Sequence, residues 1–265
     1  MRRRGPRTAV ALAAVAVAFV ILPLAGVVWR APWSDLRSEL ASPGLRTTLR
    51  LSLVCSLSAA VLSVALGVPL AWVLARVDFP GRRLVRALTL LPMVFPPVVG
   101  GVALLLAFGR RGLVGGLLFD WFGVRLPFTT AGAVVAETFV AMPFLVITAE
   151  AAFRSLDRRY EEAARTLGAS RWTVFRRITL PLARPGLAAG VALCWARALG
   201  EFGATITFAG NTPGRTQTIP LQVYLLIESG RLESAIVLSL VLLAVSVAVL
   251  VGLRDRWLFA GPPPA

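Results

Sequence analysis

Six long apolar segments constrain the fold of this chain more than any other feature. They cover residues 9–28, 51–75, 87–108, 131–149, 187–209 and 233–253. Each is close to the roughly 20 apolar residues that a transmembrane helix needs. The chain is 57% hydrophobic and its mean hydropathy is +0.77, values typical of a polytopic membrane protein. We therefore expect an all-α membrane helical bundle with six transmembrane helices, the first being an uncleaved anchor.

The residues that are missing exclude several classes of function. The sequence contains no histidine and no lysine, so it cannot carry a P-loop ATP site or use histidine for catalysis or metal binding. We expect no catalytic residue, no metal site and no cofactor bound by this chain. Cys55 and Cys194 lie inside apolar segments and are expected to be packing residues. The net charge of +15 is spread between apolar segments, which argues against a nucleic-acid partner.

The arginines predict the orientation in the bilayer. With the N-terminus inside, 18 arginines fall in inner segments and 9 in outer ones, while Arg197 lies within a span. Positive charge in short loops accumulates on the cytoplasmic side. We therefore expect a multi-pass protein of the bacterial cytoplasmic membrane, with both termini and the loop 154–184 in the cytoplasm.

The loop 154–184 has the pattern of two short helices around a glycine. Asp157 is a suitable N-cap for a first helix, which carries an apolar stripe. The stripe consists of Tyr160, Ala163, Ala164 and Leu167. Gly168 suits the left-handed position that ends a helix, and Ser170 can cap a second helix that "LPLARP" is expected to break. On periodicity alone, an amphipathic helix lying on lipid is an equal alternative.

The same loop resembles the permeases of binding-protein-dependent ABC importers. Their signature, E-A-A, three residues, G, nine residues, I-x-L-P, is present as Glu162, Ala163, Ala164, Gly168, Ile178, Leu180 and Pro181. The resemblance implies the type I importer transmembrane fold and a loop that docks on a separate ATPase subunit dimer, which binds ATP and Mg²⁺. The residues it implies for ATPase coupling are Tyr160, Glu161, Glu162, Ala163, Ala164, Leu167, Gly168 and Ala169.

Two further stretches, 91–115 and 195–224, resemble the molybdate branch of this family, and sulfate permeases share much of the second. The resemblance implies an importer of molybdate, an extracytoplasmic binding protein and a permease homodimer; a heterodimer with a second permease is the alternative. Tungstate has the same shape and charge and nearly the same size, so we expect it to be a second substrate. A sulfate or thiosulfate permease is the alternative. The similarity covers a core at 45–253. It leaves an arginine-rich tip with the first span and outer loop at 1–44, and a cytoplasmic proline-rich tail at 254–265.

Several residues inside the spans are candidates for the translocation pathway or its support. They are Pro96, Pro97, Glu137, Arg197, Glu201 and Gly203. Prolines free backbone carbonyls, which are tolerated in lipid where neighbouring helices or a cavity satisfy them; a simple packing kink is the alternative. Arg197 and Glu201 share one helix face, and Glu137 is expected to complete a network with Arg197. A purely structural ion pair is the alternative.

Two rival functions use the same charged residues. A secondary transporter would use Glu201 or Glu137 as a proton relay, but it leaves the loop 154–184 without a role. An intramembrane enzyme would use Glu201 as general base and Arg197 as anion clamp, but no nucleophile is arranged nearby. We therefore expect a translocating subunit and not an enzyme.

Overall fold

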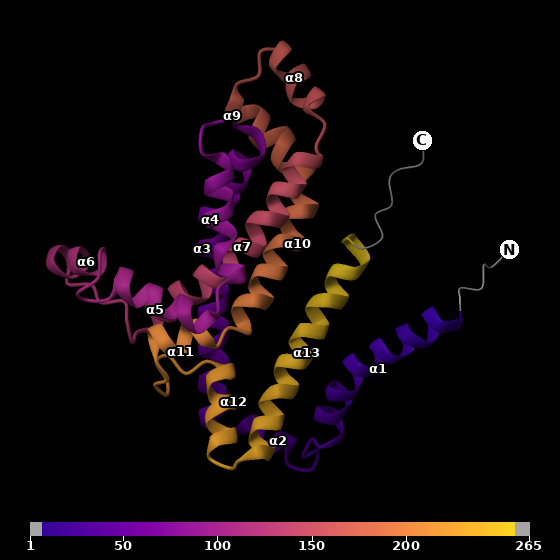
Figure 1. Ribbon diagram of the computed structural model, residues 1–265, viewed down its shortest axis with the longest axis vertical. Helices are drawn as coiled ribbons and strands as arrows, with labels where there is room; N and C mark the ends of the chain where they lie inside the picture. The colour runs from indigo at the N-terminus through magenta and orange to yellow at the C-terminus, as the bar shows by residue number, and fades with distance from the viewer. Residues whose placement is uncertain (1–6, 258–265) are drawn as a thin grey trace.

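A computed structural model describes residues 7–257, and this part of the chain is helical and contains no strand. The helices in Figure 1 are α1 (Arg7–Trp29), α2 (Leu36–Ala41), α3 (Pro43–Arg76), α4 (Arg82–Val94), α5 (Pro97–Phe108), α6 (Gly115–Phe122), α7 (Thr130–Ser155), α8 (Arg158–Thr166), α9 (Arg171–Val174), the π-helical turn η1 (Phe175–Thr179), α10 (Leu180–Leu199), α11 (Gly203–Ala209), α12 (Ile219–Glu228) and α13 (Leu232–Trp257). The predicted all-α class is confirmed.

Five helical segments in the described part of the chain are long and apolar enough to cross a membrane. They are α1, α3, α7, the continuous helix from Arg171 through α10, and α13. Four of them match predicted spans and run past the predicted limits at one or both ends. The predicted tail, 254–265, overlaps the end of α13, which continues to Trp257. Residues 258–265 of that tail, and residues 1–6 of the predicted tip, lie outside the described residues.

The third predicted span, 87–108, is not a single helix. α4 ends at Val94 and α5 begins at Pro97, while Phe95 and Pro96 between them are extended, with ψ of 135° and 127°. Each of these two residues precedes a proline, and a proline ring disfavours helical backbone in the residue before it. The prolines therefore end the helix where the sequence predicted broken hydrogen bonding, and the segment 87–108 is not one helix long enough to span the membrane.

The fifth predicted span, 187–209, is also placed differently. α10 ends at Leu199, and a short break precedes α11, which begins at Gly203. Toward the loop, "LPLARP" does not break the helix as predicted. Instead the chain stays helical from α9 through η1 into α10, with Pro181 in the first turn of α10. Pro181 has no backbone N–H to donate to the preceding helical turn. The π-helical turn before it, which is wider than an α-helical turn, lets the helix continue without that hydrogen bond.

The core lies where α3, α7 and α10 pack together. It is centred on buried side chains that include Leu74, Leu145 and Phe153, with Cys194 fully buried among them. Gly190 of α10 allows close approach, because a Cβ atom there would lie 3.0 Å from a Leu145 methyl carbon. Small residues at such contacts are characteristic of membrane bundles. Both cysteines are free and buried, as expected of packing residues.

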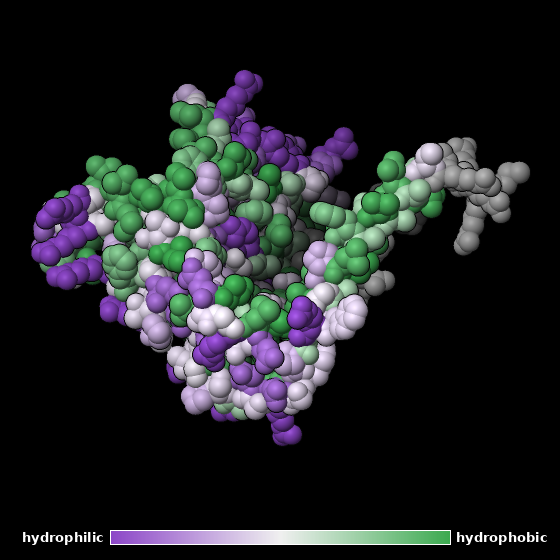
Figure 2. Space-filling view, turned by 60° about the horizontal axis from the view of Figure 1, so that its bottom comes forward, coloured by the Kyte–Doolittle hydropathy of each residue, from purple (hydrophilic) through white to green (hydrophobic). Residues whose placement is uncertain are grey.

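The arrangement of the helices separates two polar ends. In Figure 1, α8 and α9 lie at the upper end of the core, whereas α2 and α12 lie at the lower end. α5 and α6 project to one side, and α1 lies beside α13 away from the core. Figure 2 shows hydrophobic residues along the flanks and hydrophilic residues gathered at α6 on the left and at the far end of the bundle. This distribution is that of a protein whose flanks contact lipid.

Candidate functional site

The loop between α7 and α10 presents one exposed helix face, which we term the α8 face and define as Tyr160, Ala163 and Leu167. Tyr160 is 61% exposed and Leu167 is 89% exposed. Ala163, which lies between them on this face, is also exposed. Large apolar side chains held in this way at the polar end of a protein indicate a docking surface.

Local chemistry fixes the shape of this loop as the sequence predicted. The Asp157 side chain accepts a hydrogen bond from the Arg159 N–H, 3.0 Å away, and caps α8. Gly168 has a φ of +82° and turns the chain after the helix, a conformation that an L side chain rarely adopts. Ser170 caps α9 by accepting from the Thr173 N–H at 3.2 Å. The loop is therefore a defined helix–turn–helix.

Five of the predicted coupling residues lie outside the α8 face: Glu161, Glu162, Ala164, Gly168 and Ala169. Ala164 and Ala169 are half-buried. Glu161 points beneath α8, where its carboxylate pairs with Arg76 of α3. Glu162 is exposed, but residues two apart on a helix do not share a face, so it lies outside the α8 face. Sequence reasoning did not predict this role for Arg76, which directly follows the predicted span 51–75.

Two broken helices meet inside the bundle. The N-terminal end of α5, after Pro96 and Pro97, packs against the N-terminal end of α11. A Cβ atom on Gly203 would lie 2.8 Å from the Pro97 Cβ, and one on Gly101 would lie 2.6 Å from the Thr207 Cβ. The absence of side chains therefore lets the two helix starts touch, and the predicted residues Pro97 and Gly203 are brought together.

Arg197 and Glu201 form an ion pair at the break between α10 and α11. The distance from Arg197 Nη2 to Glu201 Oε2 is 2.7 Å, and the side chains are 28% and 1% exposed. The second carboxylate oxygen accepts a hydrogen bond from the Ala204 N–H at 2.8 Å. Glu201 therefore caps α11 and has its charge neutralised, so it does not present a free carboxylate to an anion.

Glu137 does not join this pair, contrary to the predicted network. It is 1% exposed on α7, and among the described residues it makes no ion pair. Its Oε2 atom is buried without a hydrogen-bond partner. Neighbouring residues of α7 and α11, Ala136 and Ala204, belong to one buried cluster. The structure therefore places Glu137 near the break without connecting it to Arg197.

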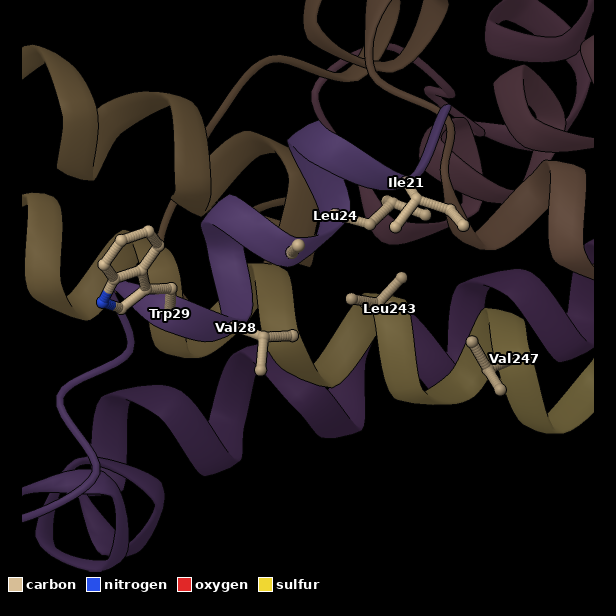
Figure 3. Close-up of a pocket in the computed structure, with 7 residues that line it drawn as sticks. Ile21, Leu24, Val28, Trp29, Leu243 and Val247 are labelled. Carbon is tan, nitrogen blue, oxygen red and sulfur yellow. The ribbon is translucent and has the colours of Figure 1, made fainter. Parts of the chain in front are cut away.

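Two cavities lie outside this region. One, between α1 and α13, is lined mainly by aliphatic side chains that include Leu24, Val28 and Leu243, together with Trp29 (Figure 3), so it carries no charged group. The other is lined by Arg110, Arg111, Phe119 and Asp120, and the Arg110 and Arg125 guanidinium groups lie 4.4 and 4.7 Å from the centre of the Phe119 ring. Sequence reasoning counted these arginines but did not predict their clustering. No group of residues suited to a metal ion is found in the described ranges.

The family pattern described as "Binding-protein-dependent transport system inner membrane component" matches residues 67–259. The chain belongs to this family. The permease is thus a multi-pass inner-membrane component of a transport system that depends on a binding protein, and it is not the ATPase. The prediction from the loop signature is confirmed at this level.

Named relatives extend over most of the permease. It is 45% identical over 251 residues to the molybdenum transport system permease protein ModB of Mycobacterium tuberculosis, covering 95% of this chain and 94% of the relative. The ModB protein of Escherichia coli is 45% identical over 208 residues, which cover 78% of this chain and 90% of the relative. The sulfate transport system permease protein CysT of Escherichia coli is 35% identical over 234 residues, which cover 87% of this chain and 84% of the relative.

Solved structures share the fold at low sequence identity. A bacterial alginate ABC transporter, in complex with an alginate-bound periplasmic protein, contains a chain with a TM-score of 0.75 and 18% identity, covering 94% of this permease and 92% of that chain. A chain of the MetNI methionine ABC transporter has a TM-score of 0.60 and 20% identity, covering 81% of this permease and 99% of that chain. The permease therefore has the transmembrane fold of ABC importers.

Proposed function

We propose that this chain is the permease subunit of an ATP-driven importer that moves molybdate into the cell. The observation that carries the proposal is the exposed α8 face within the importer signature, because it supplies a docking surface that a secondary transporter does not need. The relatives named as molybdenum transport permeases, at 45% identity, support the substrate. Tungstate has the same charge and shape as molybdate, so we expect it to be a second substrate.

The α8 face is proposed to bind a cytoplasmic ATPase subunit, with one such subunit for each of two permease copies. ATP and Mg²⁺ bind to that partner. Ala163 has only a methyl side chain and is exposed, so a partner can approach the backbone of α8 closely. The turn at Gly168 keeps the segment after α8 from covering this face.

The pathway is proposed to run past the junction of α5, α10 and α11. Broken helices at the level of a bundle core expose backbone groups that can line a polar route. The Arg197–Glu201 pair supports this route by holding the α10–α11 break in place and by neutralising a carboxylate that would repel a dianion. A homodimer would place this junction in two copies, and an extracytoplasmic molybdate-binding protein would deliver the anion.

The same proposal sets the orientation. Both termini and the loop 154–184 are cytoplasmic, and α4 with α5 supplies the sixth crossing between α3 and α7. Cysteine at position 170, placed in a background without the two buried native cysteines, tests this orientation. It should react with an impermeant thiol reagent in inverted vesicles and stay unmodified in intact cells; modification in intact cells contradicts the topology.

The function is tested by ATP hydrolysis of the complex reconstituted with its ATPase subunit and binding protein. Molybdate-loaded and tungstate-loaded binding protein should stimulate hydrolysis, and sulfate at equal concentration should not. Stimulation by sulfate alone would move the assignment to the sulfate branch, which the 35% identity to a sulfate permease makes the second candidate. Stimulation by thiosulfate alone would place it in the same branch.

A further inference from the structure

The carboxylate of Glu161 joins several helices beneath the α8 face. Its Oε1 atom lies 3.2 Å from Nη2 of Arg76, the last residue of α3. The same oxygen accepts a hydrogen bond from the Thr179 hydroxyl at 2.9 Å. Thr179 is the last residue of η1 and directly precedes α10. One oxygen of the docking helix therefore contacts the cytoplasm-facing ends of two core helices.

Arg76 extends this connection to the third core helix. Its Nη2 atom also donates a hydrogen bond to the Leu156 carbonyl at 3.2 Å, at the end of α7. The Arg76 and Glu161 side chains are 7% and 13% exposed. Water screens charged contacts little when the groups are buried in this way. The cluster of Arg76, Leu156, Glu161 and Thr179 therefore links α8 to α3, α7 and α10 together.

The π-helical turn η1 lies directly on this connection. The N–H of Leu180 donates to the carbonyl of Phe175, five residues earlier, and such turns occur frequently at functional sites. Phe175, at the start of the turn, packs edge-on against Trp72 of α3 with ring centres 5.8 Å apart. The turn is thus held to α3 at one end by an aromatic contact and to α8 at the other by Glu161.

We infer that Glu161 is a positioning residue that transmits movement of the docking helix to the core helices through Arg76 and Thr179. When the ATPase subunit displaces α8, the buried carboxylate pulls on the ends of α3 and α10 and, through Arg76, on α7. α10 then carries the displacement to its break with α11, beside the proposed pathway. This inference rests on the proposed function, in which the α8 face binds the ATPase subunit.

The test uses the full complex in proteoliposomes and measures the number of anions imported per ATP hydrolysed. Glu161→Gln removes the charge while keeping the side-chain shape, and Thr179→Val removes the hydroxyl. The loss of a buried charge-assisted hydrogen bond changes an equilibrium about tenfold, so we expect the ratio to fall about tenfold for Glu161→Gln. Thr179→Val should lower it less. The matched control is Asp78→Asn, since Asp78 pairs with Arg82 but its side chain is 88% exposed; its ratio should stay at the wild-type value.

The ratio separates transmission from simple damage to the fold. A misfolded fraction lowers uptake and hydrolysis in parallel and leaves the ratio unchanged, and that result would overturn the inference. Loss of co-purification of Glu161→Gln with the ATPase subunit would also overturn it, because Glu161 would then act in docking. Failure of the proposed function gives a different result: the ATPase subunit would bind and respond normally to an Ala163→Trp variant, whose bulky side chain blocks the α8 face.

Discussion

Replacement of Arg197 by methionine tests how the broken helix beside the proposed pathway is held. The change keeps an unbranched side chain but removes the guanidinium that lies 2.7 Å from the Glu201 carboxylate. Glu201 is 1% exposed, so its charge would be left in a low-dielectric site with only the Ala204 N–H as partner. The variant therefore isolates the consequence of an unpaired buried carboxylate.

The expected cost follows from the burial of each partner. Breaking a buried pair from one side destabilises a protein by about 3–5 kcal/mol, and the partial exposure of Arg197, 28%, places this case near the lower limit. A loss of about 3 kcal/mol corresponds to a fall in Tm of roughly 6–12 °C for a chain of this size. Glu201→Gln should cost only about 1–2 kcal/mol, because the amide oxygen still caps α11 and Arg197 can reach water.

The assay is thermal unfolding of the purified permease in detergent, with the single variants and the double variant compared. The double variant has no buried charge, so its loss should be smaller than the sum of the two single losses by about 1 kcal/mol or more. Additive losses, or a smaller effect of Arg197→Met than of Glu201→Gln, would show that the ion pair does not hold the break.

Three further predictions concern a helix contact, a turn and a titration. Gly101→Ala should lower the Tm and impair transport, since its Cβ would lie 2.9 Å from the Ala204 carbonyl oxygen, whereas Gly44→Ala, with nothing within 4 Å, should leave both unchanged. Gly168→Val strains a φ of +82°, by about 1–2 kcal/mol, and should reach the membrane yet lose ATPase stimulation when the complex is reconstituted. The hydrogen bond that Tyr224 donates to Glu228 raises the pKa of the phenol, so Glu228→Gln should shift its titration, followed by ultraviolet absorbance, to lower pH; an unchanged or higher pKa would contradict the contact.

The features that the sequence predicted well depend on neighbouring residues. Asp157, Gly168 and Ser170 act within a few positions of themselves, so capping and turn chemistry were enough to place α8 and α9. The loop falls between two long apolar segments, which places it outside the membrane. The apolar stripe on its first helix was therefore predicted to form an exposed face. Composition alone likewise predicted four spans that match long apolar helices of the structure, out of six predicted.

The features that the sequence did not predict depend on contacts between distant residues. Periodicity does not reveal that Pro97 meets Gly203, or that Arg76 pairs with Glu161, since each contact joins separate helices. The continuation of the helix through Pro181 depends on a π-helical turn, which has no sequence signal of its own. Charge alone suggested that Glu137 joins Arg197, but Glu201, four residues further along the chain in the break after α10, pairs with the guanidinium.

The central claim is that ATP hydrolysis on a partner bound to the α8 face drives an oxyanion across this permease. Its most direct measurement is the uptake of labelled molybdate into proteoliposomes that contain the permease, the ATPase subunit and loaded binding protein. We predict accumulation that requires ATP, is competed by tungstate and is lost in the Ala163→Trp variant. Accumulation without ATP, or driven by a proton gradient and unaffected by Ala163→Trp, would contradict the account.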